Sequence, residues 1–203
     1  MATLLVRWTT AVTVAESVGF LVPVAVGTTM VDRPWYVGLP ALLGAGAVEG
    51  AVLGWAQSVV LRGVLPGVRG HRWVMLTSGA AVVAYLLGTA SALTATTSGW
   101  MQMVLPILCG LLLVLSIGAA QWLELRHHVP HAASWAPATA VAWLLALGAF
   151  LAIATPLWHE GQRLWVTVLI GVGAGLLMAF VQAVLTGWWL VRLLSRRVDV
   201  SRL

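Results

Sequence analysis

Six largely apolar stretches, separated by short polar segments, determine what this chain can fold into. Each contains roughly 20 residues or more, enough for a helix to cross a hydrocarbon layer about 30 Å thick. Hydrophobic residues make up 61% of the 203 residues and charged residues only 8%, so a water-soluble domain could not bury this much apolar surface. We therefore predict an all-α integral membrane protein with a single transmembrane domain over residues 1–203. The expected helices cover residues 4–27, 36–62, 73–94, 100–126, 135–154 and 164–194.

The arginines predict the orientation of the chain. All eleven basic residues are arginine. If the N-terminus is in the cytoplasm, only Arg33 and Arg163 lie outside, and the other arginines lie on the cytoplasmic side. Cytoplasmic segments carry the excess of basic residues, so we expect a multi-pass protein of the bacterial inner (plasma) membrane with both termini in the cytoplasm. The arginines form no basic stripe interleaved with aromatic residues, so we expect lipid rather than nucleic acid as a partner.

A pattern centred on glutamine occurs in two of the stretches. Gln57 has glycines eleven and three residues before it and an arginine five residues after it, and Gln121 has the same residue types at the same offsets. A Trp–Thr pair with a spacing of four opens the following helix in both cases, at Trp73 and Trp135. Gln182 marks a third copy that lacks the arginine. Agreement at several offsets favours an internal repeat of about sixty residues over chance recurrence in a glycine-rich membrane chain.

This repeat predicts how the helices pack. Each unit has two helices, so the first helices of the units are the second, fourth and sixth of the chain. We expect a pseudo-threefold bundle of two-helix units in which these even-numbered helices are central and the odd-numbered helices form an outer layer. Small residues let helix backbones approach closely in a membrane. The glycines expected between the even helices are Gly46, Gly50, Gly54, Gly110, Gly118, Gly171 and Gly175.

Two segments of the chain resemble a family of uncharacterised multi-spanning bacterial membrane proteins. The segments are EGAVLGWAQSVVLR, from Glu49 to Arg62, and QWLELR, from Gln121 to Arg126. Members of the family carry E-G-x-x-L-G-x-x-Q-x-x-V-L-R and Q-W-L-x-L-R, followed by a helix with a Trp–Thr–Gly pattern. The resemblance covers most of the chain, although the first helix is a weaker match and the third copy lacks the arginine. It implies no activity, cofactor or site residue.

Two acidic residues interrupt the apolar stretches near the middle of the bilayer. Glu16 is nine residues past Arg7, or about 13 Å at 1.5 Å per residue, and Glu49 is thirteen residues before Arg62, or about 20 Å. An unpaired ionised carboxylate is unfavourable at this depth, so each must be protonated, hydrogen-bonded or matched by a cation. We expect the two to form one site, because consecutive helices are usually neighbours. The alternative is that each only bonds neighbouring helices together.

Other side chains are candidates for the same ligand site. Gln57, Gln121 and Gln182 fall at one depth and converge in the threefold arrangement, where their amides could line a polar pocket or only connect the helices. Most of the tryptophans lie near predicted helix ends, as in an interfacial aromatic belt. Trp55, Trp122 and Trp143 lie farther from the predicted helix ends and could form an aromatic ligand cage, and of these we include Trp55 as a candidate ligand-binding residue.

The sequence contains no recognisable catalytic motif. It has no Ser/His/Asp order, no phosphate loop and no zinc-type ligand spacing, and Pro130 interrupts the histidines that follow Glu124. We therefore predict that the protein is not an enzyme and holds no cofactor or metal. The alternative is a membrane enzyme that uses Glu16 and Glu49.

Two functional interpretations follow from these residues. In the first, the protein binds or transports a small solute or cation at a polar site near the bilayer midplane. In the second, it is a non-catalytic accessory or assembly subunit with a membrane protein partner in a larger complex. The short loops are compatible with both interpretations, because any such partner would have to meet the chain within the bilayer.

Overall fold

The computed structural model describes residues 1–30, 32–93 and 99–200, and its long elements are all helices. The helices are α1 (Ala2–Met30), α2 (Trp35–Arg62), α3 (Gly70–Leu93), α4 (Trp100–Leu125), α5 (Trp135–Leu157) and α6 (Leu164–Val200), with the short 3₁₀ helix η2 (Ala132–Ser134) before α5. All 6 long helices are long and apolar enough to span a membrane, which confirms that part of the prediction. Thr94, the predicted end of the third helix, lies outside the described residues.

The largest difference at a helix start is in α3, which begins at Gly70 rather than at Trp73. The backbone N–H of Trp73 donates to the Arg69 carbonyl at 3.0 Å, so the charged segment before Trp73 forms the first turn of the helix. Helix ends in a membrane protein can extend into the polar interface, where water satisfies the backbone groups of the terminal turn. Hydropathy alone therefore marks the apolar core of α3 but not its first turn.

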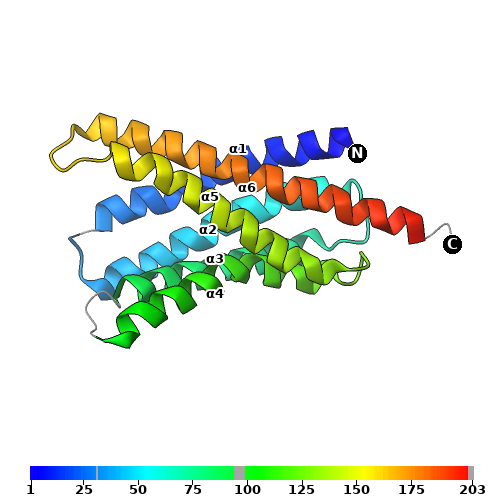
Figure 1. Cartoon of the computed structure of the whole chain (residues 1–203), viewed down its shortest axis with the longest axis horizontal. Coiled ribbons are helices and arrows are strands. Elements are labelled where there is room, and N and C mark those ends of the chain that lie inside the picture. Colours follow the sequence, from blue (N-terminus) through cyan, green and yellow to red (C-terminus); the bar gives the residue numbers. More distant parts are fainter. Residues whose placement is uncertain (31, 94–98, 201–203) are drawn as a thin grey trace.

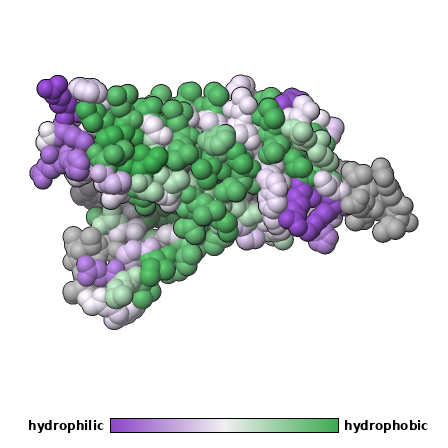
Figure 2. Space-filling model, turned by 45° about the horizontal axis from the view of Figure 1, so that its top comes forward, coloured by the Kyte–Doolittle hydropathy of each residue, from purple (hydrophilic) through white to green (hydrophobic). Residues whose placement is uncertain are grey.

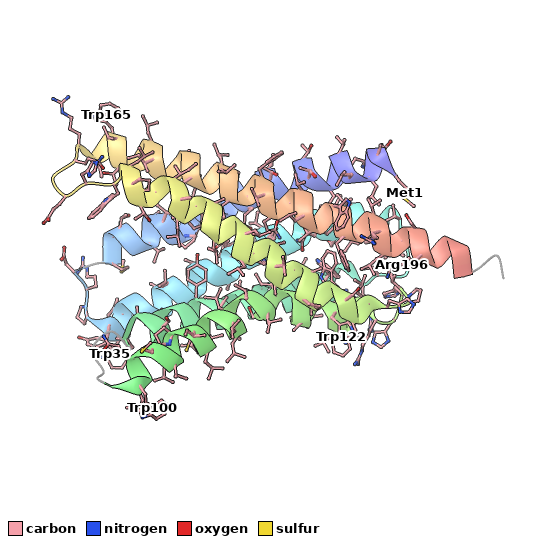
Figure 3. All side chains as sticks on the ribbon, viewed as in Figure 1. Met1, Trp35, Trp100, Trp122, Trp165 and Arg196 are labelled. Carbon is pink, nitrogen blue, oxygen red and sulfur yellow. The ribbon has the colours of Figure 1, made fainter. Side chains whose placement is uncertain are left out.

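Both chain termini lie at the same end of the bundle, together with the α2–α3 and α4–α5 connections (Figure 1). We call this the terminal end and the opposite end, where α1, α3 and α5 finish, the distal end. On the face in Figure 2, hydrophilic residues gather at the two ends and hydrophobic residues cover the belt between them. Trp35, Trp100 and Trp165 lie at the distal end and Trp122 at the terminal end (Figure 3). This distribution is typical of a multi-pass membrane protein with aromatic residues at both interfaces.

The six long helices contact one another in chain order. Each packs against the next, and α6 packs against α1, which closes a ring. No two of α2, α4 and α6 are among the helix pairs with extensive contact in the described part of the chain. The prediction that the even-numbered helices pack together at the centre is therefore wrong.

The glycines of α2 show why the even-numbered helices do not pack against one another. A Cβ added to Gly50 would lie 2.6 Å from the Ala81 Cβ, and one added to Gly54 would lie 2.9 Å from the Thr77 Cβ. Gly46 faces Tyr85 in the same way. All three neighbours are on α3, so the glycine stripe brings α2 against the next helix of the chain instead of against α4 or α6.

The other predicted packing glycines differ from one another. A Cβ added to Gly118 of α4 would lie 2.8 Å from the Thr139 Cβ of α5, and one added to Gly175 of α6 would lie 3.5 Å from the Phe20 Cδ1 of α1. A Cβ added to Gly110 or Gly171 would meet no atom of another helix within 4 Å among the described residues. Two of the glycines that fit the sequence pattern therefore make no close helix contact.

The terminal half of the bundle is packed around three tryptophans. Trp8, Trp73 and Trp135 come from α1, α3 and α5, and each is at most 1% exposed. The Trp135 ring centroid lies 6.1 Å from that of Trp8 and 6.4 Å from that of Trp73. Buried leucines near the helix ends, including Leu61 and Leu125, pack against them. The odd-numbered helices thus supply the aromatic centre of this half.

Substitution of the α2 glycines should separate α2 from α3. We expect Gly50→Leu and Gly54→Leu each to lower the free energy of unfolding by about 1–3 kcal/mol, because the added side chain meets backbone as well as side-chain atoms of α3. The midpoint of thermal unfolding in detergent measures this change. Gly44→Leu is the matched control, since an added Cβ at this exposed position of α2 meets nothing within 4 Å. Equal midpoints for Gly54→Leu and Gly44→Leu would contradict the assigned packing.

Candidate functional site

Glu16 and Glu49 lie side by side inside the bundle, as the sequence predicts. Glu16 of α1 is 1% exposed and Glu49 of α2 is 8% exposed. The two helices approach closely here, because a Cβ added to Gly19 would lie only 3.3 Å from the Glu49 Cα. The two carboxyl groups lie near enough to interact with each other.

The hydrogen bonds of the two carboxyl groups are unequal. The Tyr85 hydroxyl of α3 donates to Glu49 Oε2 at 2.6 Å. Apart from the adjacent Glu49 carboxyl group, neither carboxyl oxygen of Glu16 has a hydrogen-bond partner among the described residues. Two carboxylates cannot donate to each other, so the pair needs one proton or one cation between its oxygens to become stable in this apolar environment.

A cavity of about 480 Å³ opens beside this pair. Residues of all six long helices line it, including Glu16, Glu49 and Tyr85. The described lining residues are otherwise mainly apolar, and none of them is an arginine or a histidine. This volume is within the range of small-molecule sites.

The cavity occupies the distal half of the bundle. On α3 its lining begins at Ala81, past Trp73, and on α4 it includes Leu113 and Ile117, which precede Gln121. The tryptophan-centred core fills the terminal half. A molecule in the cavity would therefore approach the carboxyl pair from the distal side.

A layer of amides separates the cavity from the terminal core. Gln57 Oε1 accepts hydrogen bonds from Trp73 Nε1 at 3.0 Å and from Gln121 Nε2 at 2.7 Å. Gln121 Oε1 accepts from Trp135 Nε1 at 2.9 Å, and its Nε2 also donates to Thr77 Oγ1 at 3.0 Å. The structure thus brings Gln57 and Gln121 together, and their amides bond four helices to one another.

Gln182 does not join this layer through a hydrogen bond. Its amide is 1% exposed, yet neither its oxygen nor its nitrogen has a partner among the described residues. The tryptophan at the corresponding place, Trp8, donates instead to Thr186 Oγ1 at 3.0 Å, one turn farther along α6. The three glutamines therefore form no continuous ring of amides.

Trp55, the aromatic candidate, is not brought to the cavity. Its side chain is 63% exposed on the outside of α2. Trp143 of α5 lines the cavity instead, and its indole Nε1 has no acceptor among the described residues.

Tyr85 is the site residue that the sequence reasoning missed. It is one of two tyrosines in the chain and the one that lies well inside an apolar span. A phenol at that depth needs a hydrogen-bond partner. The position of Tyr85 in the sequence could therefore have indicated that it bonds to a polar group inside the bundle.

Glu124, by contrast, belongs to a structural cluster at the terminal end. Its side chain is buried and accepts from the backbone N–H of Arg69 at 2.9 Å. Its Oε2 lies 3.3 Å from Arg72 Nη1, and its Oε1 lies 3.2 Å from His128 Nε2. These bonds attach the end of α4 to the α2–α3 connection. In the described part of the chain, no group of three or more His, Cys, Asp or Glu side chains is placed to hold a metal ion.

Comparisons with protein-family models, with curated proteins and with solved structures gave no match to this chain.

The hydrogen bonds of Gln121 allow a test of the amide layer between the cavity and the terminal core. We expect Gln121→Leu to lower the free energy of unfolding by about 1–3 kcal/mol, because it leaves the buried Trp135 N–H without an acceptor and removes a donor to Gln57. Gln182→Leu should be nearly neutral, because that amide has no partner to lose among the described residues. Chemical unfolding of both purified variants in the same detergent compares the two costs. A Gln182→Leu loss as large as that of Gln121→Leu would refute this distinction.

Proposed function

We propose that this protein binds or transports a small solute or cation at the Glu16–Glu49 pair, without catalysing a reaction. One observation carries the proposal: a buried carboxyl group, whose oxygens have no partner except the adjacent Glu49 carboxyl, lines a cavity of about 480 Å³. Ionisable residues within a membrane domain usually serve a transport or binding path, because their burial is unfavourable unless a partner is supplied. A ligand with positive charge would supply that partner.

The corresponding contacts support an internal repeat. The Gln57–Trp73 bond between α2 and α3 has its counterpart in the Gln121–Trp135 bond between α4 and α5. The close contact of Gly54 with Thr77 likewise corresponds to that of Gly118 with Thr139. In the third unit, formed by α6 and α1, the tryptophan bond goes to a threonine. We therefore retain a pseudo-threefold repeat of two-helix units but place the even helices in the ring rather than at its centre.

The orientation proposed from the arginines determines the side of the membrane from which a ligand reaches the site. If the terminal end faces the cytoplasm of a bacterial cell, the distal cavity is reached from outside the inner membrane or from its outer leaflet. The closed terminal half then separates the carboxyl pair from the cytoplasm. Capture of a ligand needs no movement of this half, whereas transport across the membrane requires it to open.

Reporter fusions test this orientation. We expect fusions in the loops around Gly67 and His131 to report the cytoplasm, and fusions around Asp32 and Glu160 to report the outside. The reason is the excess of arginines at the terminal end. A cytoplasmic signal at Asp32 together with an external signal at Gly67 would show that the chain has the opposite orientation.

Cation binding tests the proposed function itself. We expect the reconstituted wild-type protein to bind one class of cation with an affinity that falls as the pH is lowered, because protons compete for the same carboxyl oxygens. Glu16→Gln and Glu49→Gln should each weaken binding at least tenfold. Calorimetric titration with inorganic and organic cations at several pH values measures both effects.

The control for charge is Glu160→Gln. It removes the same formal charge from an exposed position on the distal α5–α6 connection. Its binding curve should match that of the wild type. If no cation or solute binds the wild type, or if all four proteins give the same curves, the two acids are packing residues and the proposed function is wrong.

An accessory role is the second candidate, and one surface feature favours it. A shallow groove on the outer surface between α3 and α4 is lined by the small residues Gly79, Ala80, Ser116 and Ala120, among others. Small residues on a lipid-facing surface allow another helix to approach closely. A stoichiometric membrane protein that copurifies with the wild type and is lost in Gly79→Leu would support this role.

A further inference from the structure

The cavity beside Glu16 and Glu49 has two chemically different parts. Its polar atoms are at the inner end, where the two carboxyl groups, the Tyr85 hydroxyl and the Trp143 indole N–H are found. The Thr89 hydroxyl, also on the wall, donates its hydrogen to the Tyr85 carbonyl at 2.9 Å. The rest of the lining is mainly apolar and includes Phe20, Leu42, Ala92, Leu113, Leu147 and Met178. A complementary ligand therefore has a polar head and an apolar body.

The head should carry one positive charge. The titratable side chains that line the cavity are Glu16, Glu49 and Tyr85, and none of the described lining residues is basic. A carboxyl pair that shares one proton has one negative charge, and two adjacent carboxylates without a proton repel each other. A single monovalent cation that replaces this proton between their oxygens leaves the charge of the pair unchanged and offsets the repulsion.

An organic ammonium fits this inner end better than a hard metal ion. Calcium takes six to eight oxygen ligands, and magnesium keeps several of its waters. The pair offers four carboxyl oxygens, one of which already accepts from Tyr85, and the walls around it are largely hydrocarbon. An ammonium group needs few acceptors, and the indole ring of Trp143 at the same end of the cavity is a side chain of the kind that attracts cations.

The apolar part is long enough for a chain. Along α3 the lining extends past Tyr85 as far as Ala92, which is seven residues or about 10 Å at 1.5 Å per residue. The volume of about 480 Å³ is too large for a small inorganic ion with no apolar body. A hydrocarbon chain would fill it and remove its apolar walls from water.

We infer that the ligand of the Glu16–Glu49 site is a lipophilic monocation, an ammonium head on a hydrocarbon chain, with its head between the carboxyl groups and its chain toward the distal end. This inference rests on the proposed function, because it assigns the ligand class of the same site. The oxygens of Glu16, which is 1% exposed, are the atoms that receive the head.

The ligand reaches the cavity from the bilayer between α4 and α5. These helices lie together at the terminal end and diverge toward the distal end (Figure 1). Leu113 of α4 and Leu147 of α5 both line the cavity and are partly exposed. An amphiphile already dissolved in the membrane could enter sideways without crossing water.

A series of primary alkylamines tests the ligand class. Methylamine, butylamine, octylamine and dodecylamine would be titrated into wild-type protein in nanodiscs, with binding referred to the free aqueous concentration. We expect affinity to increase about fourfold for each added methylene until the cavity is full, and then to level off. Octanol and dodecanol, which have the chain but no charge, should bind at least tenfold more weakly than the matching amines. Glu16→Gln should remove the difference between amine and alcohol.

A cavity-filling variant tests where the chain lies. Gly88 of α3 lines the cavity, and a Cβ added to it would meet Leu113 Cδ1 at 3.6 Å, an ordinary contact. We expect Gly88→Leu to weaken dodecylamine binding at least tenfold and to leave methylamine binding unchanged. Gly44→Leu on α2 is the control, because Gly44 is exposed, does not line the cavity, and an added Cβ meets nothing within 4 Å.

The outcomes separate the two proposals. If methylamine or sodium binds the carboxyl pair as tightly as dodecylamine, and neither chain length nor Gly88→Leu matters, the inferred ligand class is wrong and the cation site stands. If amines and alcohols bind equally, the cavity selects only an apolar body and the inferred charge is wrong. If neither amines nor inorganic cations bind, both proposals are wrong. The chain-length series in the wild type gives its answer even if Gly88→Leu does not fold.

Discussion

The bilayer offers no hydrogen bonds, so every polar group that this chain carries into the membrane must be satisfied inside the bundle. In the terminal half this requirement is largely met: Gln57 and Gln121 bond to each other and to the indoles of Trp73 and Trp135. In the distal half it is not met, since the Glu16 oxygens have no partner among the described residues except the adjacent Glu49 carboxyl group. The closed part of the bundle and the candidate site are therefore two results of the same constraint.

The site arises where the proposed repeat units differ. Eight residues past the central tryptophans Trp8, Trp73 and Trp135 stand Glu16, Ala81 and Trp143, which all line the cavity. The corresponding position thus holds a glutamate in one proposed unit, an alanine in another and a tryptophan in the third. The small residue belongs to the close α2–α3 contact at Gly50, and the other two line the cavity with polar groups. In the proposed repeat, unequal side chains at one level are enough to produce a polar end in an apolar cavity.

The sequence predicts the helices well because an apolar span of about 20 residues has few alternatives in a membrane. It also predicts from depth and chain order that Glu16 lies near Glu49, and from the threefold arrangement that Gln57 lies near Gln121, although Gln182 does not bond to them. The rotation of each helix about its axis is much harder to predict, since lipid and protein interior are both apolar and the usual contrast between faces is weak. For this reason Trp55 faces outward, the glycines of α2 face α3, and Tyr85 was not recognised as the partner of Glu49.

The central claim is that one proton or one cation lies between the carboxyl groups of Glu16 and Glu49. Infrared difference spectroscopy of the protein in lipid observes this directly through the C=O stretching band of a protonated carboxylic acid. We expect such a band in the ligand-free wild type and its loss when a lipophilic ammonium is added. In the Glu16→Gln/Glu49→Gln double variant, we expect no response of this spectral region to the ammonium. A band that stays unchanged in the wild type when the cation is added at saturating concentration would contradict the central claim.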